Sequence, residues 1–381
     1  MTKRKSVIIV SIILTVIVAG LTVLLLAYTQ SWPNSYNNES QPAPTSPEED
    51  RLACIDALPD KIKIGQKIMV AAYSNQISSE TPVLVSTTMG GIIVMDAVTA
   101  KQIRDFSSSM AITPLIAVDQ EGGTVQRYTA NGYLPSAKEM ADNFSVGQAY
   151  DKYLSDSNYL SDIGITTNFA PVVDVISGSF NPLPGRLYST DPEIVTNYAS
   201  AAIRASKDAG ITPVVKHFPG LGSATGNTDY VSATTDPISA LQTRDLVPYR
   251  QLAQQNPDVM IANAIVPGLT AGKPAVWSPE AISLLRDMGY QKAVVYTDSL
   301  TAQAVPGTLA DAAIKAWQAG VDIALIVQTR EQTPQLGSYL NEIITSASKA
   351  LQSGNLNKEE FSASIARIFD RKGVDACLVE T

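Results

Sequence analysis

The sequence is poor in several residue types that would each point to a particular class of protein. Its 381 residues include one histidine and two cysteines, no run of lysine or arginine extends beyond the first few positions, and the formal net charge is −8. An acidic chain without a basic run is a poor partner for a polyanion, which argues against nucleic acid binding. A lone histidine is usually a hydrogen-bonded residue rather than a metal ligand, so we expect no metal site and no cofactor.

The N-terminal segment contains the longest apolar run of the chain. Residues 7–28 are almost wholly apolar, which is long enough to cross a ~30 Å hydrocarbon layer as a helix. Three basic residues precede them and stay cytoplasmic, so we expect a cytoplasmic stub at 1–6, a single-pass anchor at 7–28 and an extracellular remainder. A cleaved signal peptide is the competing interpretation. Residues 29–50 are rich in proline, serine, asparagine and glutamate and predict a disordered linker.

Strand and helix signals alternate along residues 51–381. Eight short apolar runs predict strands: Ile68–Ala72, Gly91–Met95, Pro114–Asp119, Thr167–Val173, Pro213–His217, Val259–Ile265, Ala293–Thr297 and Asp322–Val327. Segments of helical spacing include Tyr150–Ile163, Pro192–Ala209, Leu241–Gln254, Pro279–Met288, Leu309–Ala319 and Lys358–Arg371. Such alternation implies parallel strands with helical crossovers, and eight runs favour an α/β fold of the (β/α)₈ TIM barrel type over an open sheet.

The two cysteines, Cys54 and Cys377, stand near the two ends of the predicted barrel domain. A closed barrel brings its first and last elements together, and we expect the domain to lie in an oxidising compartment. We therefore predict a Cys54–Cys377 disulfide, with two separate buried thiols as the alternative. Cys54 also lies too far from the apolar run to suggest a lipidated N-terminus.

Polar residues stand at the carboxyl ends of several predicted strands: Asp119, Asp174, Lys216 with His217, Asn263 and Asp298. In a barrel, these strand ends converge on one mouth, where active sites are found. We therefore expect the functional site there.

Four segments carry a family resemblance. They are DQEGG at 119–123, NFAPVVD at 168–174, KHFPG at 216–220 and TDSL at 297–300. With these words the sequence resembles glycoside hydrolase family 3 over roughly residues 60–330, and the order and spacing are similar to the bacterial β-N-acetylglucosaminidases of that family. The resemblance implies a hydrolase acting on amino-sugar glycosides.

The nucleophile can be assigned from the chemistry of the reaction. Hydrolysing a glycoside with retention needs one carboxylate to attack the anomeric carbon and a second group that first protonates the leaving oxygen and then activates water. Asp298 ends a predicted strand, and the resemblance of TDSL to the family's nucleophile motif implies the first of these roles. The alternative is an aspartate that only caps the following helix.

Five further residues are predicted to contact the sugar. The resemblance implies that Asp119 holds sugar hydroxyls, and that Lys216, His217 and Arg186 donate to hydroxyls or to an N-acetyl group. Arg127 is a weaker candidate. The alternative for each charged residue is a structural ion pair at the barrel mouth.

One loop departs from the family pattern. In the family's N-acetylglucosaminidases an Asp-His dyad after KHFPG supplies the acid/base, but its two positions here are Asn227 and Asp229. Asp229 itself can take the role if its environment favours proton donation; Glu121 is another candidate; or acid catalysis is lost and the barrel only binds glycan. Gly222 and Gly226 suggest that this loop is a mobile lid.

These features together predict a retaining exo-β-N-acetylglucosaminidase acting on cell-wall or surface glycans such as muropeptides. The single-domain form favours N-acetylhexosaminides, because the family's β-glucosidases usually draw their acid/base from a second domain. The alternative is a catalytically impaired family 3 barrel that binds extracellular glycan.

Overall fold

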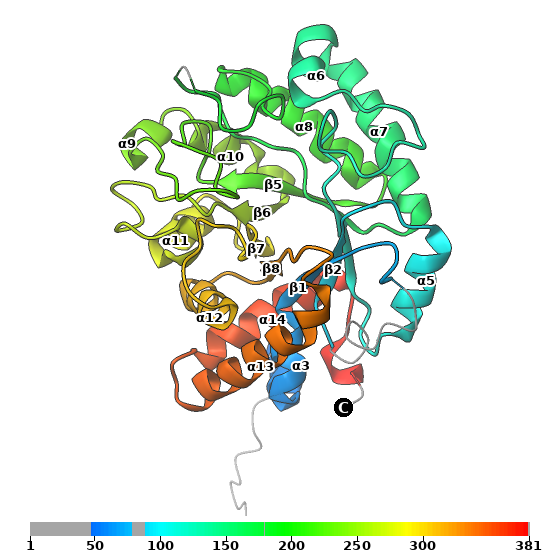
Figure 1. Cartoon of the computed structure of the whole chain (residues 1–381), viewed down its shortest axis with the longest axis vertical. Helices are drawn as coiled ribbons and strands as arrows, with labels where there is room; N and C mark the ends of the chain where they lie inside the picture. Colours follow the sequence, from blue (N-terminus) through cyan, green and yellow to red (C-terminus); the bar gives the residue numbers. More distant parts are fainter. Residues whose placement is uncertain (1–46, 78–87, 179, 380–381) are drawn as a thin grey trace, which may run out of the picture. The chain divides into compact units, whose positions relative to one another are not determined.

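A computed structural model of the chain describes residues 47–77, 88–178 and 180–379 (Figure 1). The stub at 1–6, the predicted transmembrane helix at 7–28 and most of the predicted linker lie outside these residues. Among the described helices, none combines the length and the apolar character needed to cross a membrane. Helix α2 (Pro47–Ala57) begins before the predicted domain boundary at residue 51, so residues 47–50 are helical where a disordered linker was expected.

Eight parallel strands form a nearly closed barrel, which confirms the predicted (β/α)₈ architecture. The strands are β1 (Ile68–Ala72), β2 (Gly91–Val94), β3 (Leu115–Val118), β4 (Thr167–Asn168), β5 (Thr212–Phe218), β6 (Asp258–Ile261), β7 (Val295–Thr297) and β8 (Ala324–Ile326). Their order is β7-β6-β5-β4-β3-β2-β1-β8. A parallel bridge between Tyr296 in β7 and Ile323, just before β8, brings the two ends of this order together. Each predicted apolar run overlaps one of these strands, although β5 extends one residue beyond its run at each end and β6 begins one residue before its run.

Strand β4 is shorter than the predicted run Thr167–Val173. Pro171 has no backbone N–H and cannot donate to a ladder, so regular pairing stops before it. The chain nevertheless continues along the barrel wall, because the backbone N–H of Phe169 donates to Val118 and that of Val173 donates to Lys216. The segment therefore still delivers Asp174 to the mouth of the barrel.

Helices surround the barrel (Figure 1). They are α2, α3 (Asp60–Gln66), α5 (Ala100–Ser109), α6 (Ala137–Asn143), α7 (Val146–Ile163), α8 (Pro192–Asp208), α9 (Ile238–Leu241), α10 (Leu246–Leu252), α11 (Pro279–Asp287), α12 (Leu309–Ala319), α13 (Leu336–Gln352) and α14 (Lys358–Lys372). The prediction for Leu309–Ala319 matches α12, and four others match within a few residues at each end. Five of the described helices have no counterpart among the predicted segments: α2, α3, α5, α6 and α13.

The predicted helix Leu241–Gln254 was wrong as a single element, because the chain forms α9 and α10 separated by a turn. Pro248 explains the break. In one continuous helix from Leu241 this proline would lie in the interior and remove a hydrogen bond, whereas a new start at Leu246 places it in the first turn.

A buried ion cluster lies at the amino-terminal end of β8, away from the mouth. The Asp322 carboxylate is fully buried and accepts hydrogen bonds from Arg286 at 3.0 Å, from Arg367 at 2.7 Å and from the backbone N–H of Val295 at 2.8 Å. Burial alone raises the pKa of Asp322, but the two arginines outweigh it and lower this pKa to about 2. The carboxylate therefore stays ionised and links α11, α14 and the strands.

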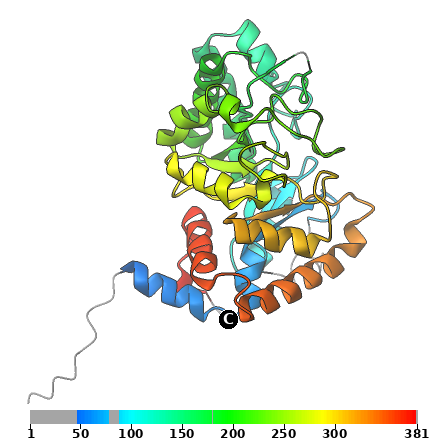
Figure 2. The same ribbon diagram turned by 90° about the vertical axis from the view of Figure 1, so that its left-hand side faces the viewer.

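The disulfide prediction is confirmed. Cys54 in α2 is bonded to Cys377 in the 3₁₀ turn Ala376–Leu378, and their Cα atoms lie 5.1 Å apart. In Figures 1 and 2, the blue helices near the start of the domain and the orange and red helices near its end lie together in the lower part of both views. The bond therefore joins the first and last helical segments of the described chain.

Reducing this disulfide is expected to lower the free energy of unfolding by about 2–5 kcal/mol, because the bond restricts the unfolded chain over a very long loop. Urea denaturation of the full-length protein with and without a phosphine reductant measures the change. The Cys54→Ser/Cys377→Ser variant serves as the control, since reductant cannot affect it further. Identical transitions for oxidised and reduced native protein would contradict the expectation.

Candidate active site

All seven residues predicted for catalysis and sugar binding line one cavity at the carboxyl ends of the strands. The cavity has a volume of about 470 Å³, and these residues are Asp119, Arg127, Arg186, Lys216, His217, Asp229 and Asp298. Its apolar lining includes Phe169, Met260 and Leu325. A cavity with both charged and apolar lining suits a pyranose ring, which has hydroxyls at its edge and C–H groups on its faces.

Lys216 and His217 are consecutive in β5, and both line the cavity. In a regular strand, successive side chains point to opposite faces, so one of the two would be turned away. The register of β5 against β6 shifts between Val215 and Phe218, at the position of these two residues. Such an irregularity re-aims side chains, and here it accompanies the placement of both cations in the site.

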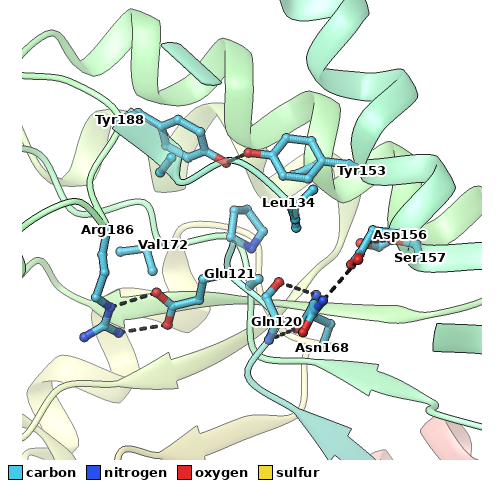
Figure 3. Close-up of a pocket in the computed structure, with 15 residues that line it drawn as sticks. Gln120, Glu121, Leu134, Tyr153, Asp156, Ser157, Asn168, Val172, Arg186 and Tyr188 are labelled. Carbon is cyan, nitrogen blue, oxygen red and sulfur yellow. Dashed lines mark hydrogen bonds and ion pairs between the residues drawn. The ribbon is translucent and has the colours of Figure 1, made fainter. Parts of the chain in front are cut away.

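Lys216 connects two carboxylates. Its Nζ lies 2.7 Å from Asp119 Oδ1 and 2.6 Å from Glu121 Oε1. Arg186 binds Glu121 through two hydrogen bonds, at 2.7 Å from Nε and 2.8 Å from the terminal nitrogen, as Figure 3 shows. The guanidinium of Arg127 is 3.6 Å from Asp119 Oδ2. Four of the five predicted sugar contacts, all except His217, thus form one charged network with Glu121 that fixes the orientation of Asp119.

The network removes Glu121 as a candidate acid. Burial raises its pKa, but Lys216 and Arg186 act more strongly together and lower it to about 2. A carboxyl that remains ionised near neutral pH has no proton to donate. Glu121 instead anchors Lys216 and Arg186, a structural role that the sequence analysis did not assign.

His217 is paired with a buried carboxylate. Its Nδ1 lies 2.8 Å from Asp174 Oδ2, while Asp174 Oδ1 accepts a hydrogen bond from the backbone N–H of Leu221 at 2.7 Å. The histidine is therefore a satisfied hydrogen-bonding residue, and its second ring nitrogen is left for the cavity. Asp174 was noted only as a polar strand end, yet it holds both His217 and the start of the loop that follows.

Asp298 directly follows β7 and is half-buried. Its carboxylate accepts a hydrogen bond from the backbone N–H of Ser299 at 2.7 Å. The next helix, α12, is capped by Thr308, so the alternative that Asp298 serves as a helix cap is wrong. Asn263 donates to the carbonyl of Ser299 at 2.7 Å and holds the chain beside the aspartate.

The charge environment of Asp298 contains opposing contributions. Burial is the largest and raises the pKa of Asp298; His217 and Lys216 lower it, while the negative charge of Asp229 raises it further. The net result is a raised pKa. Asp229 and Asp298 line the same cavity.

Asp229 lies in a loop that is fastened to its neighbour. Its backbone carbonyl accepts a hydrogen bond from Gln303 at 3.2 Å, and its N–H donates to the side chain of Asn227 at 2.9 Å. Asp229 itself is exposed, so the chain does not shield it in this structure. The two glycines have packing reasons, because a Cβ at Gly222 would meet the carbonyl oxygen of Val175 at 1.7 Å and one at Gly226 would meet Val231 at 2.6 Å. They no longer support the prediction of a mobile lid.

Gln120 braces the loop that carries Glu121 and Arg127. Its side-chain oxygen accepts hydrogen bonds from the backbone N–H groups of Arg127 and Tyr128, and its side-chain nitrogen donates to Asp156 at 3.0 Å. Asn168 exchanges two hydrogen bonds with the Gln120 backbone. Figure 3 shows Gln120, Asn168 and Asp156 together to the right of Glu121. Gln120 and Asn168 belong to the DQEGG and NFAPVVD motifs that the sequence showed, but the sequence did not reveal the hydrogen bonds between these two residues.

A family comparison agrees with this geometry. The family described as glycosyl hydrolase family 3 N terminal domain matches residues 61–370. The chain belongs to glycoside hydrolase family 3. This confirms the family that the four motifs indicated and extends the likeness beyond residue 330.

Several members of family 3 are similar to the chain in sequence. The beta-hexosaminidase LpqI of Mycobacterium tuberculosis is 37% identical over 270 residues, which cover 68% of this chain and 68% of that protein. A beta-hexosaminidase of Alkalilimnicola ehrlichii is 32% identical over 295 residues, covering 72% of this chain and 84% of the relative. Both of these relatives are named beta-hexosaminidases.

Solved family 3 structures share the fold. A glycosyl hydrolase from Mycobacterium smegmatis has a TM-score of 0.76 at 34% identity, covering 84% of this chain and 98% of that chain. A β-N-acetylglucosaminidase from a Paenibacillus species has a TM-score of 0.75 at 26% identity, covering 85% of this chain and 65% of the other.

Proposed function

We propose that this family 3 protein is a retaining exo-β-N-acetylglucosaminidase, with Asp298 as the nucleophile and Asp229 as the acid/base. The observation that carries the proposal is that Asp298 caps no helix and lies in a cavity with Asp229 and the charged sugar-binding network. The relatives named β-hexosaminidases support the choice of an N-acetylhexosaminide substrate.

The first chemical step forms a glycosyl-enzyme bond. A carboxylate oxygen of Asp298 attacks the anomeric carbon, and the bond from that carbon to the glycosidic oxygen breaks. Asp229 gives its proton to the departing oxygen, so the leaving group departs as a neutral alcohol. Lys216 and His217, which both lower the pKa of Asp298, favour the ionised nucleophile.

The second step releases the sugar. Asp229, now ionised, takes a proton from a water molecule whose oxygen attacks the anomeric carbon, and the bond to Asp298 breaks. Asp119, Lys216 and Arg127 hold the sugar hydroxyls throughout, Asp119 being oriented by its ion pairs. Arg186 acts on the sugar mainly by fixing Glu121, because its guanidinium already makes two hydrogen bonds to that carboxylate.

The N-terminal segment supports a proposal for the place of action. We propose that residues 7–28 anchor the chain as a single transmembrane helix and hold the barrel outside the cell. The substrate is then a cell-wall or surface glycan containing N-acetylglucosamine, such as a muropeptide. The apolar run and its preceding basic residues support this placement.

The binding-only alternative has no support from the described residues. A barrel that only bound glycan would have no need for a carboxylate at position 298, whereas the sugar network alone would serve it. The nucleophile candidate is retained in the cavity, and the relatives are named as enzymes.

A trapping experiment tests the proposal on the full-length protein. We expect incubation with 5-fluoro-N-acetylglucosaminyl fluoride, followed by digestion and mass spectrometry, to find a glycosyl adduct on the peptide containing Asp298. The Asp298→Asn variant is the control and should carry no adduct. An adduct elsewhere would contradict the assignment, and sugar binding without turnover or adduct would establish the binding-only alternative.

A further inference from the structure

Tyr230 is a large aromatic side chain at the edge of the active-site cavity. It lines the same cavity as Asp229 and Asp298, yet 68% of its surface is exposed. Within the described residues its hydroxyl has no hydrogen-bond partner. Tyrosine rings usually bury most of their apolar surface, so this ring presents an open face at the mouth of the site.

The backbone holds Tyr230 in place before any ligand arrives. Its N–H donates to the carbonyl of Asn227 at 3.1 Å, and the adjacent Thr228 accepts a hydrogen bond from the backbone N–H of Ala304 at 3.2 Å. Thr228 is buried against that neighbouring segment. A ring on a fastened backbone loses little conformational freedom on binding, which makes a contact with it more effective.

The position of Tyr230 relative to the chemistry indicates which part of a substrate it meets. Asp229, the preceding residue, protonates the oxygen between the two parts of the substrate in the proposed mechanism. In the same mechanism, Asp119 and Lys216 hold the sugar that is cleaved. Tyr230 lies beside the acid/base at the open rim, which is the side from which the leaving group departs.

We infer that Tyr230 forms a leaving-group subsite that takes a second pyranose ring against its exposed face. The inference rests on the proposed function, and it identifies the substrate class as a glycan in which the terminal N-acetylglucosamine is linked to another sugar. The aromatic face supplies contact with the C–H groups of that ring.

Two substrates with similar leaving-group chemistry separate this role from catalysis. Diacetylchitobiose and methyl N-acetyl-β-glucosaminide both release an alkyl alcohol, but only the disaccharide brings a second ring. We expect Tyr230→Ala to lower the ratio of kcat/KM for diacetylchitobiose to that for the methyl glycoside by about fivefold to tenfold, mainly through KM. Tyr230→Phe keeps the ring and is expected to keep the ratio.

Tyr133 provides a matched control. It is 63% exposed, but its hydroxyl donates to Glu139 at 2.7 Å and it does not line the cavity. Tyr133→Ala is therefore expected to leave both rates and their ratio unchanged. An unchanged ratio in Tyr230→Ala, or an equal loss on both substrates, would overturn the subsite.

Failure of the proposed function gives a different result, because the native protein would then cleave neither substrate. In that case, calorimetry decides the subsite by comparing the affinities for diacetylchitobiose and N-acetylglucosamine. A preference for the disaccharide that falls in Tyr230→Ala supports the subsite, and a preference that is absent or unaffected overturns it.

Discussion

The Asp298→Asn variant is expected to lose hydrolysis by about 10⁴-fold or more in kcat. Asparagine has nearly the same shape and can still accept the hydrogen bond from Ser299, so the fold of the loop is retained. It carries no negative charge and cannot form the glycosyl ester, which closes the covalent route. Steady-state kinetics of the full-length protein on 4-nitrophenyl N-acetyl-β-glucosaminide measure the loss.

The Asp229→Asn variant is the matched comparison, because it removes the acid/base and leaves the nucleophile. We expect a loss of about 10²–10⁴-fold on the methyl glycoside and a smaller loss of the first step on the nitrophenyl glycoside, whose leaving group needs no proton. If Asp298→Asn instead lost more activity on the methyl glycoside than on the nitrophenyl glycoside, the two roles would be reversed. Equal losses at Asp229 on both substrates would remove it as the acid/base.

The pH profile gives an independent check on the nucleophile. Asp298 must be ionised to attack, and burial raises its pKa above the usual value for aspartate. Activity is therefore expected to fall with decreasing pH through that raised pKa, so the acid limb of kcat/KM lies above the range of an ordinary aspartate.

The Asp322→Asn variant is expected to lose about 3–5 kcal/mol of unfolding free energy. The change removes the negative charge that pairs with both Arg286 and Arg367 and leaves two guanidinium groups without their partner in a buried setting. The pKa of Asp322 is lowered to about 2, so its ionised form contributes stability that is complete above pH ~4 and is lost as the pH falls toward 2. Urea denaturation at neutral pH measures the effect.

Asp287→Asn is the control for this stability prediction. Asp287 is exposed at the end of α11, close in sequence to Arg286, and its replacement is expected to change stability by less than about 0.5 kcal/mol. Equal effects of the two substitutions would contradict the role of the buried cluster. The activity of folded Asp322→Asn protein is expected to remain, because the cluster lies away from the mouth of the barrel.

The sequence predicted the barrel because its strands carry a signal that does not depend on distant partners. A strand buried on both faces is a short apolar run, and the polar residue that ends it marks the mouth. This is why Asp119, Lys216 and Asp298 could be assigned to one site. Helix α12 was equally clear, because its apolar spacing and its capping Thr308 are local features.

The missed features depend on contacts between distant residues. Glu121 looked like a free carboxylate until Arg186, 65 residues later, was found bonded to it. Gly222 of the Asp229 loop suggested mobility, whereas its reason is the close approach of the Val175 backbone, which no local pattern reveals. Leu241–Gln254 had helical spacing throughout, and only the position of Pro248 divided it.

The bond between Cys54 and Cys377 makes almost the whole domain one covalent ring. A protease that cuts any single loop between these two positions therefore opens the ring without releasing a fragment. Both pieces stay attached through the sulfur bridge, and the barrel can remain assembled after the cut. Separation of the two pieces therefore requires a second cut or a reductant.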